Sequence, residues 1–210
     1  MEKKKKLEAL RKELETAKLP LKGKANLVFG EGNIDCAVMF IGEAPGFNED
    51  LQRRPFVGRS GQLLDEMIKS LGWKRPDVYI TNIVKRRPPD NRDPLPEEIE
   101  SYKPYLARQI EIIKPKIIAT LGRFSMNYFL PFAKITRDHG RIFETEGRTI
   151  FPLFHPAAAL RATNVLNDLR SDFKKLPDIL SGNPPRPALR GAGASVQNQA
   201  TQKPQQDKLF

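Results

Sequence analysis

Four short apolar runs place the tightest limit on how this chain folds. The runs are residues 37–41, 78–80 with Ile83 just beyond, 116–121 and 148–154. Continuous apolar runs of this kind are typical of strands buried on both faces of a sheet. Because they alternate with helical segments, we expect an α/β fold: a three-layer α/β/α sandwich around a central, mainly parallel four-stranded sheet.

Helical periodicity occurs between and around these runs. We expect helices at residues 2–18, 60–71, 97–113, 122–129 and 164–180, and a hairpin around Glu146-Gly147 that leads into the last strand. In the first helix, Leu7, Leu10 and Leu14 share one face of a lysine-rich, amphipathic segment. The proline-rich stretch at 85–96 predicts a long exposed loop.

The length of the chain indicates one domain. A chain of 210 residues buries one good core, which we assign to residues 1–180. From Ser181 the composition changes to proline, glycine and glutamine, which contribute little to a core. Residues 181–210 are therefore predicted to be a disordered tail.

The charge of the chain indicates a polyanionic partner. The sequence carries 36 lysines and arginines against 25 acidic residues, a formal net charge of +11. Neutralising phosphates releases counterions and favours binding, although solubility alone is a competing explanation.

No apolar run approaches the ~20 residues of a membrane span, and the N-terminus lacks an apolar signal core. We expect a monomer that is cytoplasmic and nucleoid-associated.

Four short motifs follow one another where apolar runs give way to turn-forming residues. They are Gly-Glu-Ala-Pro-Gly at 42–46, Arg-Pro-Phe-Val-Gly at 54–58, Thr-Asn at 81–82 and His-Pro-Ala-Ala-Ala-Leu at 155–160. Strand ends at the carboxyl edge of an α/β sheet are where ligands bind. Together the motifs offer carboxylates, an aromatic ring, an amide and an imidazole, which suit a planar, hydrogen-bonding ligand.

The first two motifs combine close backbone approach with a flat apolar surface. Their glycines let a ligand reach backbone amides, and Glu43, Glu49 and Asp50 place three carboxylates nearby. An ordinary strand–helix turn with solvated acids is the alternative. Phe56 is suited to stacking on an unstacked base, or otherwise to a peripheral core contact.

Asn82 and His155 offer directional hydrogen bonds. The amide of Asn82 presents a donor and an acceptor in one plane, which matches the edge of a pyrimidine; a turn or cap is its alternative role. His155, kept out of a helix by Pro156, can donate to an oxygen that becomes negative during a reaction. His139 lies in a sequence typical of a surface turn, and we assign it no role.

In these ordered motifs the chain resembles the family 4 uracil-DNA glycosylases, from residue 28 to residue 180. The resemblance implies hydrolysis of the N-glycosidic bond of uracil in DNA, leaving an abasic site without strand cleavage, in base excision repair. It implies that Phe56 stacks on the flipped uracil and that Asn82 reads its polar edge. The Gly42–Glu43 backbone and His155 would stabilise negative charge on the departing base.

The resemblance leaves part of the assignment open. Either Glu43 or Glu49 would position the water or stabilise the cationic sugar, with Asp50 in support. Two other functions also stay open: a non-catalytic or regulatory DNA-binding relative, and a glycosylase for another deaminated base such as hypoxanthine or xanthine.

Basic and apolar side chains near these motifs are candidates for holding DNA. Lys85 and Arg87 are suited to phosphate contacts, with a solvated surface as the alternative. The resemblance implies that Leu160 or Arg161 enters the base stack that the flipped nucleotide leaves.

The chain departs from the family at its iron–sulfur cluster. Family 4 members typically hold a [4Fe–4S] cluster with four cysteines, and the matching positions here are Glu15, Lys18, Arg86 and Tyr102. Cys36, the single cysteine, matches none of them, so we predict no cluster, no metal and no other cofactor. Packing of the leucines in the first helix, or contacts between Glu15 and Arg86, is our hypothesis for what replaces it.

The last residues of the sequence suggest a second partner. Gln206, Leu209 and Phe210 lie in the pattern of the Gln-x-x-Leu-Phe peptides that dock repair proteins onto replication sliding clamps. A disordered tether with two apolar residues suits such a groove; a chance ending is the alternative.

Overall fold

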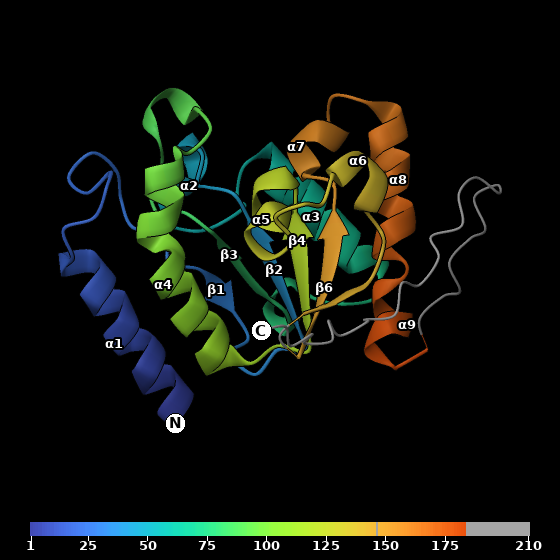
Figure 1. Cartoon of the computed structure of the whole chain (residues 1–210), viewed down its shortest axis with the longest axis horizontal. Coiled ribbons are helices and arrows are strands. Elements are labelled where there is room, and N and C mark those ends of the chain that lie inside the picture. The colour runs from blue at the N-terminus through green and yellow to red at the C-terminus, as the bar shows by residue number, and fades with distance from the viewer. Residues whose placement is uncertain (146, 184–210) are drawn as a thin grey trace, which may run out of the picture.

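A six-stranded sheet, ordered β1-β3-β2-β4-β6-β5, forms the middle layer of the computed structural model (Figure 1). Its strands are β1 Glu31–Gly32, β2 Val38–Gly42, β3 Tyr79–Asn82, β4 Ile117–Leu121, β5 Phe143–Thr145 and β6 Arg148–Leu153. The four central strands β3, β2, β4 and β6 are parallel, as predicted. Two short antiparallel edge strands extend them: β5 belongs to the expected hairpin, and β1 was not predicted.

The structure describes residues 1–145 and 147–183. The predicted tail lies almost wholly outside this range, and with it the candidate clamp-binding residues Gln206, Leu209 and Phe210.

Helices form the outer layers. They are α1 Glu2–Thr16, α2 Phe47–Gln52, α3 Arg59–Ser70, α4 Pro96–Ile113, α5 Arg123–Phe129, α6 Ile135–Asp138, α7 Pro156–Ala159, α8 Thr163–Phe173 and α9 Leu176–Leu180. The single helix expected at 164–180 is wrong, because it divides into α8 and α9. Pro177 lies in the first turn of α9, where it can begin a helix but cannot continue one.

The two faces of the sheet carry separate apolar cores. Helices α1 and α4 lie side by side over one face, and α3 and α8 cover the other (Figure 1). Leu7, Leu10 and Leu14 of α1 are buried in the first core, which confirms the predicted apolar face. In the second core, the ring of Phe40 stacks on that of Phe173 with their centroids 5.5 Å apart. None of the helices in the described ranges is long and apolar enough to cross a membrane.

The order of the strands determines where a ligand can bind. From β2 the chain pairs first with β3 on one side and then with β4 on the other. Such a reversal opens a crevice at the carboxyl edge of a parallel sheet. Gly42 and Asn82 end β2 and β3 there, and Gly122 and His155 follow β4 and β6 at the same edge.

Candidate active site

Gly42 and Asn82 form the floor of the site. They are register partners on the parallel strands β2 and β3. A Cβ at position 42 would lie 2.4 Å from Asn82 Oδ1 and 2.5 Å from the ring of Phe56, so only glycine permits this approach. Asn82 is 2% exposed, and its Oδ1 has no hydrogen-bond partner among the described residues. An unpaired buried acceptor of this kind suits the N–H group of a ligand.

The loop that carries Phe56 is held in a strained conformation. Phe56 has a φ of 50°, which is unusual for a residue with a large side chain. The guanidinium of Arg75 donates to the backbone carbonyls of Pro55 and Phe56 and pairs with Asp65. Gly61 leaves room for this backbone, since a Cβ there would lie 1.9 Å from the Phe56 carbonyl oxygen. No local sequence pattern indicates this role for Arg75, because these three partners lie 10 to 20 residues away and a fourth, Glu31, lies 44 residues away.

Both oxygens of the Glu49 carboxylate accept hydrogen bonds from backbone amides. Its Oε1 accepts from Val57 N and Gly58 N, both at 2.8 Å, and its Oε2 accepts from Gly46 N at 3.2 Å. These bonds join the loop before α2 to the loop after Phe56. Asp50 is likewise engaged, because its Oδ1 accepts from Asn26 N at 2.7 Å. Both carboxylates therefore organise the loops of the site.

Glu43 is the carboxylate that remains available for chemistry. No residue in the described ranges hydrogen-bonds to its side chain. Burial raises the pKa of Glu43 to about 7, the charge of Asp93 adds to this rise, and Arg123 opposes it. Arg123 and Asp93 form an ion pair at 2.6 Å. A carboxylate with a pKa near neutrality is a good general base.

His155 is held as a neutral hydrogen-bond donor. Its Nδ1 accepts from Ala157 N at 3.0 Å, so the ring proton lies on Nε2. Burial lowers the pKa of His155 to about 4, with a small opposing effect from Glu49. Its ring centroid lies 5.7 Å from that of Phe56. Gly122 packs against His155, since a Cβ there would lie 2.9 Å from His155 Cβ and 3.4 Å from the ring carbon Cδ2.

The second histidine, His139, is also withdrawn from solvent. His139 was expected in a surface turn, but its side chain is 8% exposed and its Nδ1 lies 2.7 Å from Asp172 Oδ2. Its ring packs on Phe154 with centroids 4.4 Å apart. The Asp172 partner is 33 residues away in sequence, which is why the local sequence did not reveal the burial of His139.

The residues expected to hold DNA occupy different environments. Lys85 is fully buried, so the prediction that it contacts phosphate is wrong. Arg87 lies over the exposed ring of Phe47, 5.1 Å from its centroid, and its Nε donates to Asn91 Oδ1. Leu160 is 41% exposed just beyond α7, and Arg161 is exposed beside it.

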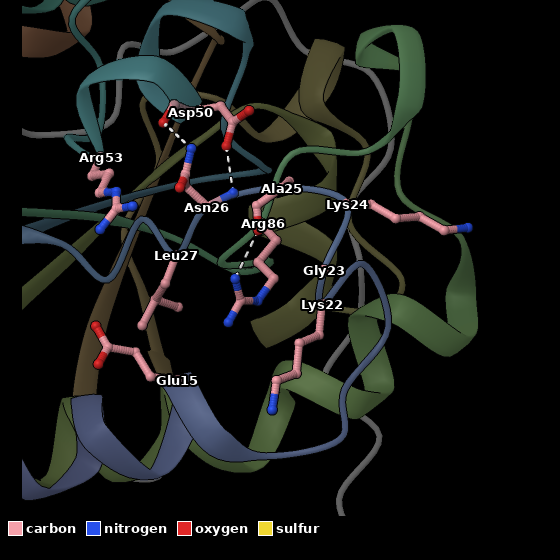
Figure 2. A pocket seen from close by; sticks show the side chains of 10 residues that line it. All are labelled: Glu15, Lys22, Gly23, Lys24, Ala25, Asn26, Leu27, Asp50, Arg53 and Arg86. Carbon is pink, nitrogen blue, oxygen red and sulfur yellow. Dashed lines mark hydrogen bonds between the residues drawn. The ribbon is translucent and has the colours of Figure 1, made fainter.

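Two of the positions that match the cluster ligands, Tyr102 and Arg86, hydrogen-bond to the N-terminal segment instead. Tyr102 is buried and donates through its hydroxyl to Pro20 O at 2.7 Å. Arg86, 6% exposed, donates to Ala25 O at 2.8 Å and to Leu14 O at 3.5 Å. Figure 2 shows the Arg86 guanidinium reaching into a cavity of about 570 Å³ that several basic side chains line.

These residues do not fit a [4Fe–4S] cluster, which needs thiolate ligands. A guanidinium donates hydrogen bonds and ligates no iron. Cys36 is buried just before β2, at the opposite edge of the sheet from Arg86. No group of three or more potential ligands among the described residues could hold a metal ion. The hypothesis of a Glu15–Arg86 contact is wrong, since Glu15 pairs with Arg11.

Comparison with known proteins agrees with this geometry. The family model of the uracil DNA glycosylase superfamily matches residues 29–176, which include all the site residues described above from Gly42 to His155. The fold is therefore that of this superfamily.

Individual relatives narrow the assignment. A type-4 uracil-DNA glycosylase from Archaeoglobus fulgidus is 44% identical over 173 residues, covering 78% of this chain and 87% of that protein. One from Sulfurisphaera tokodaii is 48% identical over 166 residues, covering 74% and 76%. One from Saccharolobus solfataricus is 46% identical over 175 residues, covering 78% and 80%. The chain belongs to the type-4 uracil-DNA glycosylases.

Proposed function

We propose that this protein hydrolyses the N-glycosidic bond of uracil in DNA and leaves an abasic site, as the first step of base excision repair. One observation carries the proposal: the unpaired, buried Oδ1 of Asn82 lies beside the ring of Phe56 on a floor that only glycine permits. Membership of the type-4 family supports the same reaction.

The site binds uracil through its face and its polar edge. Phe56 stacks on the flipped base, which contributes about 1–3 kcal/mol. Asn82 Oδ1 accepts the N3–H of uracil while its Nδ2 donates to O4. Cytosine carries no proton at N3 and has an amino group in place of O4, so the same amide disfavours it. Flipping costs a few kcal/mol, which these contacts offset.

Charge separation is the main difficulty of the reaction. As the C1′–N1 bond breaks, its electron pair goes to the base and positive charge develops on the deoxyribose. The Nε2–H of the neutral His155 donates to O2 as that oxygen becomes negative. Glu43, ionised above its raised pKa, activates a water that adds to C1′ or stabilises the cationic sugar.

DNA is held around this pocket by surface side chains. Arg87 and Arg161 contact phosphates, and Leu160 fills the vacated base stack. The reaction is monofunctional: Lys85, near Asn82, has its Nζ in three hydrogen bonds and is not free to attack the sugar.

The remaining assignments follow from the sequence. The protein acts without a cofactor, as a monomer, in the compartment that holds the DNA. The tail residues Gln206, Leu209 and Phe210 dock on a sliding clamp; removing residues 206–210 should abolish clamp binding without changing base release.

A gel assay tests the proposed reaction. Duplex and single-stranded oligonucleotides with one uracil should give alkali-labile sites with the wild type. Asn82→Ala and His155→Ala should each lower the rate by about 10²–10³-fold, with circular dichroism spectra like that of the wild type. Binding of the oligonucleotides without base release would contradict the proposal and favour a non-catalytic DNA-binding protein.

A further inference from the structure

Lys85 is a buried basic group to which the proposed reaction assigns no role. Its side chain is fully buried. Its Nζ lies 2.6 Å from Thr81 Oγ1, 2.7 Å from the backbone oxygen of Asn82 and 2.7 Å from Gln109 Oε1. The amine therefore lies directly behind the residue that reads the base.

The hydrogen-bond partners of Lys85 favour its ammonium form. The Thr81 hydroxyl donates its proton to Phe29 O at 2.9 Å, so its oxygen accepts from Lys85. Gln109 Nε2 donates to Phe29 O at 3.1 Å and to Tyr79 Oη at 3.0 Å, which makes Oε1 an acceptor. The third partner is a backbone carbonyl. With the Thr81 proton on Phe29 O, all three partners of Nζ are acceptors, an arrangement that only the ammonium form, with three N–H protons, satisfies completely.

No acidic group offsets this charge in the part of the chain that the structure describes. Burial lowers the pKa of Lys85 well below the usual lysine value, and no carboxylate opposes that effect. An unpaired buried ammonium is unfavourable even when it is hydrogen-bonded. An anion formed in front of Asn82 would provide the missing negative charge.

We propose that Lys85 is a positioning residue with an electrostatic role: its ammonium fixes Asn82 and stabilises the uracil anion as that anion leaves. The electron pair of the broken C1′–N1 bond spreads over N1, O2 and O4 of the base. His155 serves the O2 side, while Asn82, backed by Lys85, serves the O4 side. The inference rests on the uracil excision proposed above.

The charge of Lys85 can be measured in the wild-type protein. In ¹⁵N-lysine-labelled enzyme, one Nζ signal should show three slowly exchanging protons at pH 7. Its loss in Lys85→Gln assigns it. A two-proton neutral amine at this position would overturn the inference.

The role of the charge is tested with two leaving groups. Single-turnover base release is compared for uracil and 5-fluorouracil in the same oligonucleotide. Fluorine withdraws electrons, so the fluorinated anion needs less stabilisation. Lys85→Gln should slow release of uracil by a factor of about 10 to 50. The factor by which it slows release of 5-fluorouracil should be about three times smaller. The ratio of the two rates does not depend on the fraction of enzyme that folds.

Two control variants distinguish an electrostatic role of Lys85 from a purely structural one. Thr81→Val removes one acceptor and keeps the ammonium, so it should lower both rates by the same factor. Lys69→Gln, exposed at the end of α3, should change neither. If Lys85→Gln lowered the rate of base release by the same factor for both substrates, the role of Lys85 would be structural only, and the inference would be overturned. A wild type that releases neither base would contradict the proposed function as well.

Discussion

Gly42 and Asn82 face each other across β2 and β3 so closely that a Cβ on the first would lie 2.4 Å from Oδ1 of the second. Asn82 Oδ1 has no hydrogen-bond partner among the described residues, and the close packing around it holds the amide in place. An unsatisfied buried acceptor costs about 1–3 kcal/mol. The site is therefore prepared for its ligand before the ligand arrives.

Replacing Gly42 tests this preparation. In Gly42→Ala the new methyl group must displace the Asn82 amide or the Phe56 ring, so base release should fall by at least about 100-fold. Urea unfolding should show a loss of about 1–3 kcal/mol, typical of overpacking. In Gly72→Ala a Cβ meets nothing within 4 Å but φ is +75°, so this variant is a control for loss of stability without a clash: it should lower the free energy of unfolding by about 1–2 kcal/mol and leave base release unchanged. Near-normal kcat in Gly42→Ala would contradict the assignment of the floor.

Glu43 should set the pH dependence of activity. Because its pKa is raised to about 7, the ionised form increases through neutrality, and kcat/KM should rise from pH 5 to pH 8 with a midpoint near 7. Glu43→Gln should lower the rate by about 10²–10³-fold and remove this rise. His155, with its pKa lowered to about 4, stays neutral throughout and adds no second step. An unchanged pH profile in Glu43→Gln would exclude Glu43 as the titrating group.

The same carboxyl group should weaken the fold at high pH. Its pKa in the folded protein lies above the ordinary glutamate value of 4.5, so the folded state binds the proton more tightly. The stability that this one group contributes is then fully present below about pH 4.5 and is lost as the pH rises through about 7. Glu43→Gln should raise the free energy of unfolding by about 1–3 kcal/mol at pH 8 and by little at pH 4.5. Urea titrations at the two pH values measure the difference.

We expect Glu49 to affect activity by holding the loop that carries Phe56. Glu49→Ala loses three hydrogen bonds to backbone amides, which should lower stability by about 2–3 kcal/mol and raise KM. Glu49→Gln keeps the oxygen that serves Val57 and Gly58, so it should recover most of the activity. If Glu49 handled the water instead, Glu49→Gln would be as inactive as Glu49→Ala.

We expect Arg86 to hold the N-terminal segment against the domain, as the cluster would in other family members. Arg86→Met removes its bonds to Leu14 O and Ala25 O and should lower stability by about 2–4 kcal/mol. Limited proteolysis should then cut near residues 17–25 faster, while Arg11→Met, an exposed control, should not change the rate. Incubation of the wild type with iron and sulfide should give no visible cluster absorption; a cluster band would overturn the prediction.

Local sequence patterns are sufficient for the central strands, the α/β class and the residues at the strand ends. Continuous apolar runs and the turn residues that follow them are local signals, so the positions of Gly42, Asn82 and His155 follow from the sequence, whereas Phe56 lies in the loop between α2 and α3. The identities of these residues also carry the family resemblance. The short strand β1 and the break between α8 and α9 have weaker signals, because each depends on only one or two residues.

Only the folded chain shows which charged groups touch the site. Lys85 looks like a surface cation in its basic stretch, yet Gln109, 24 residues away, completes its burial. Glu43 and Glu49 are alike in sequence, but only folding brings the amides of Val57 and Gly58 to Glu49 and leaves Glu43 available. Burial and hydrogen bonding depend on partners distant in the chain, and they determine the protonation state and the role of each group.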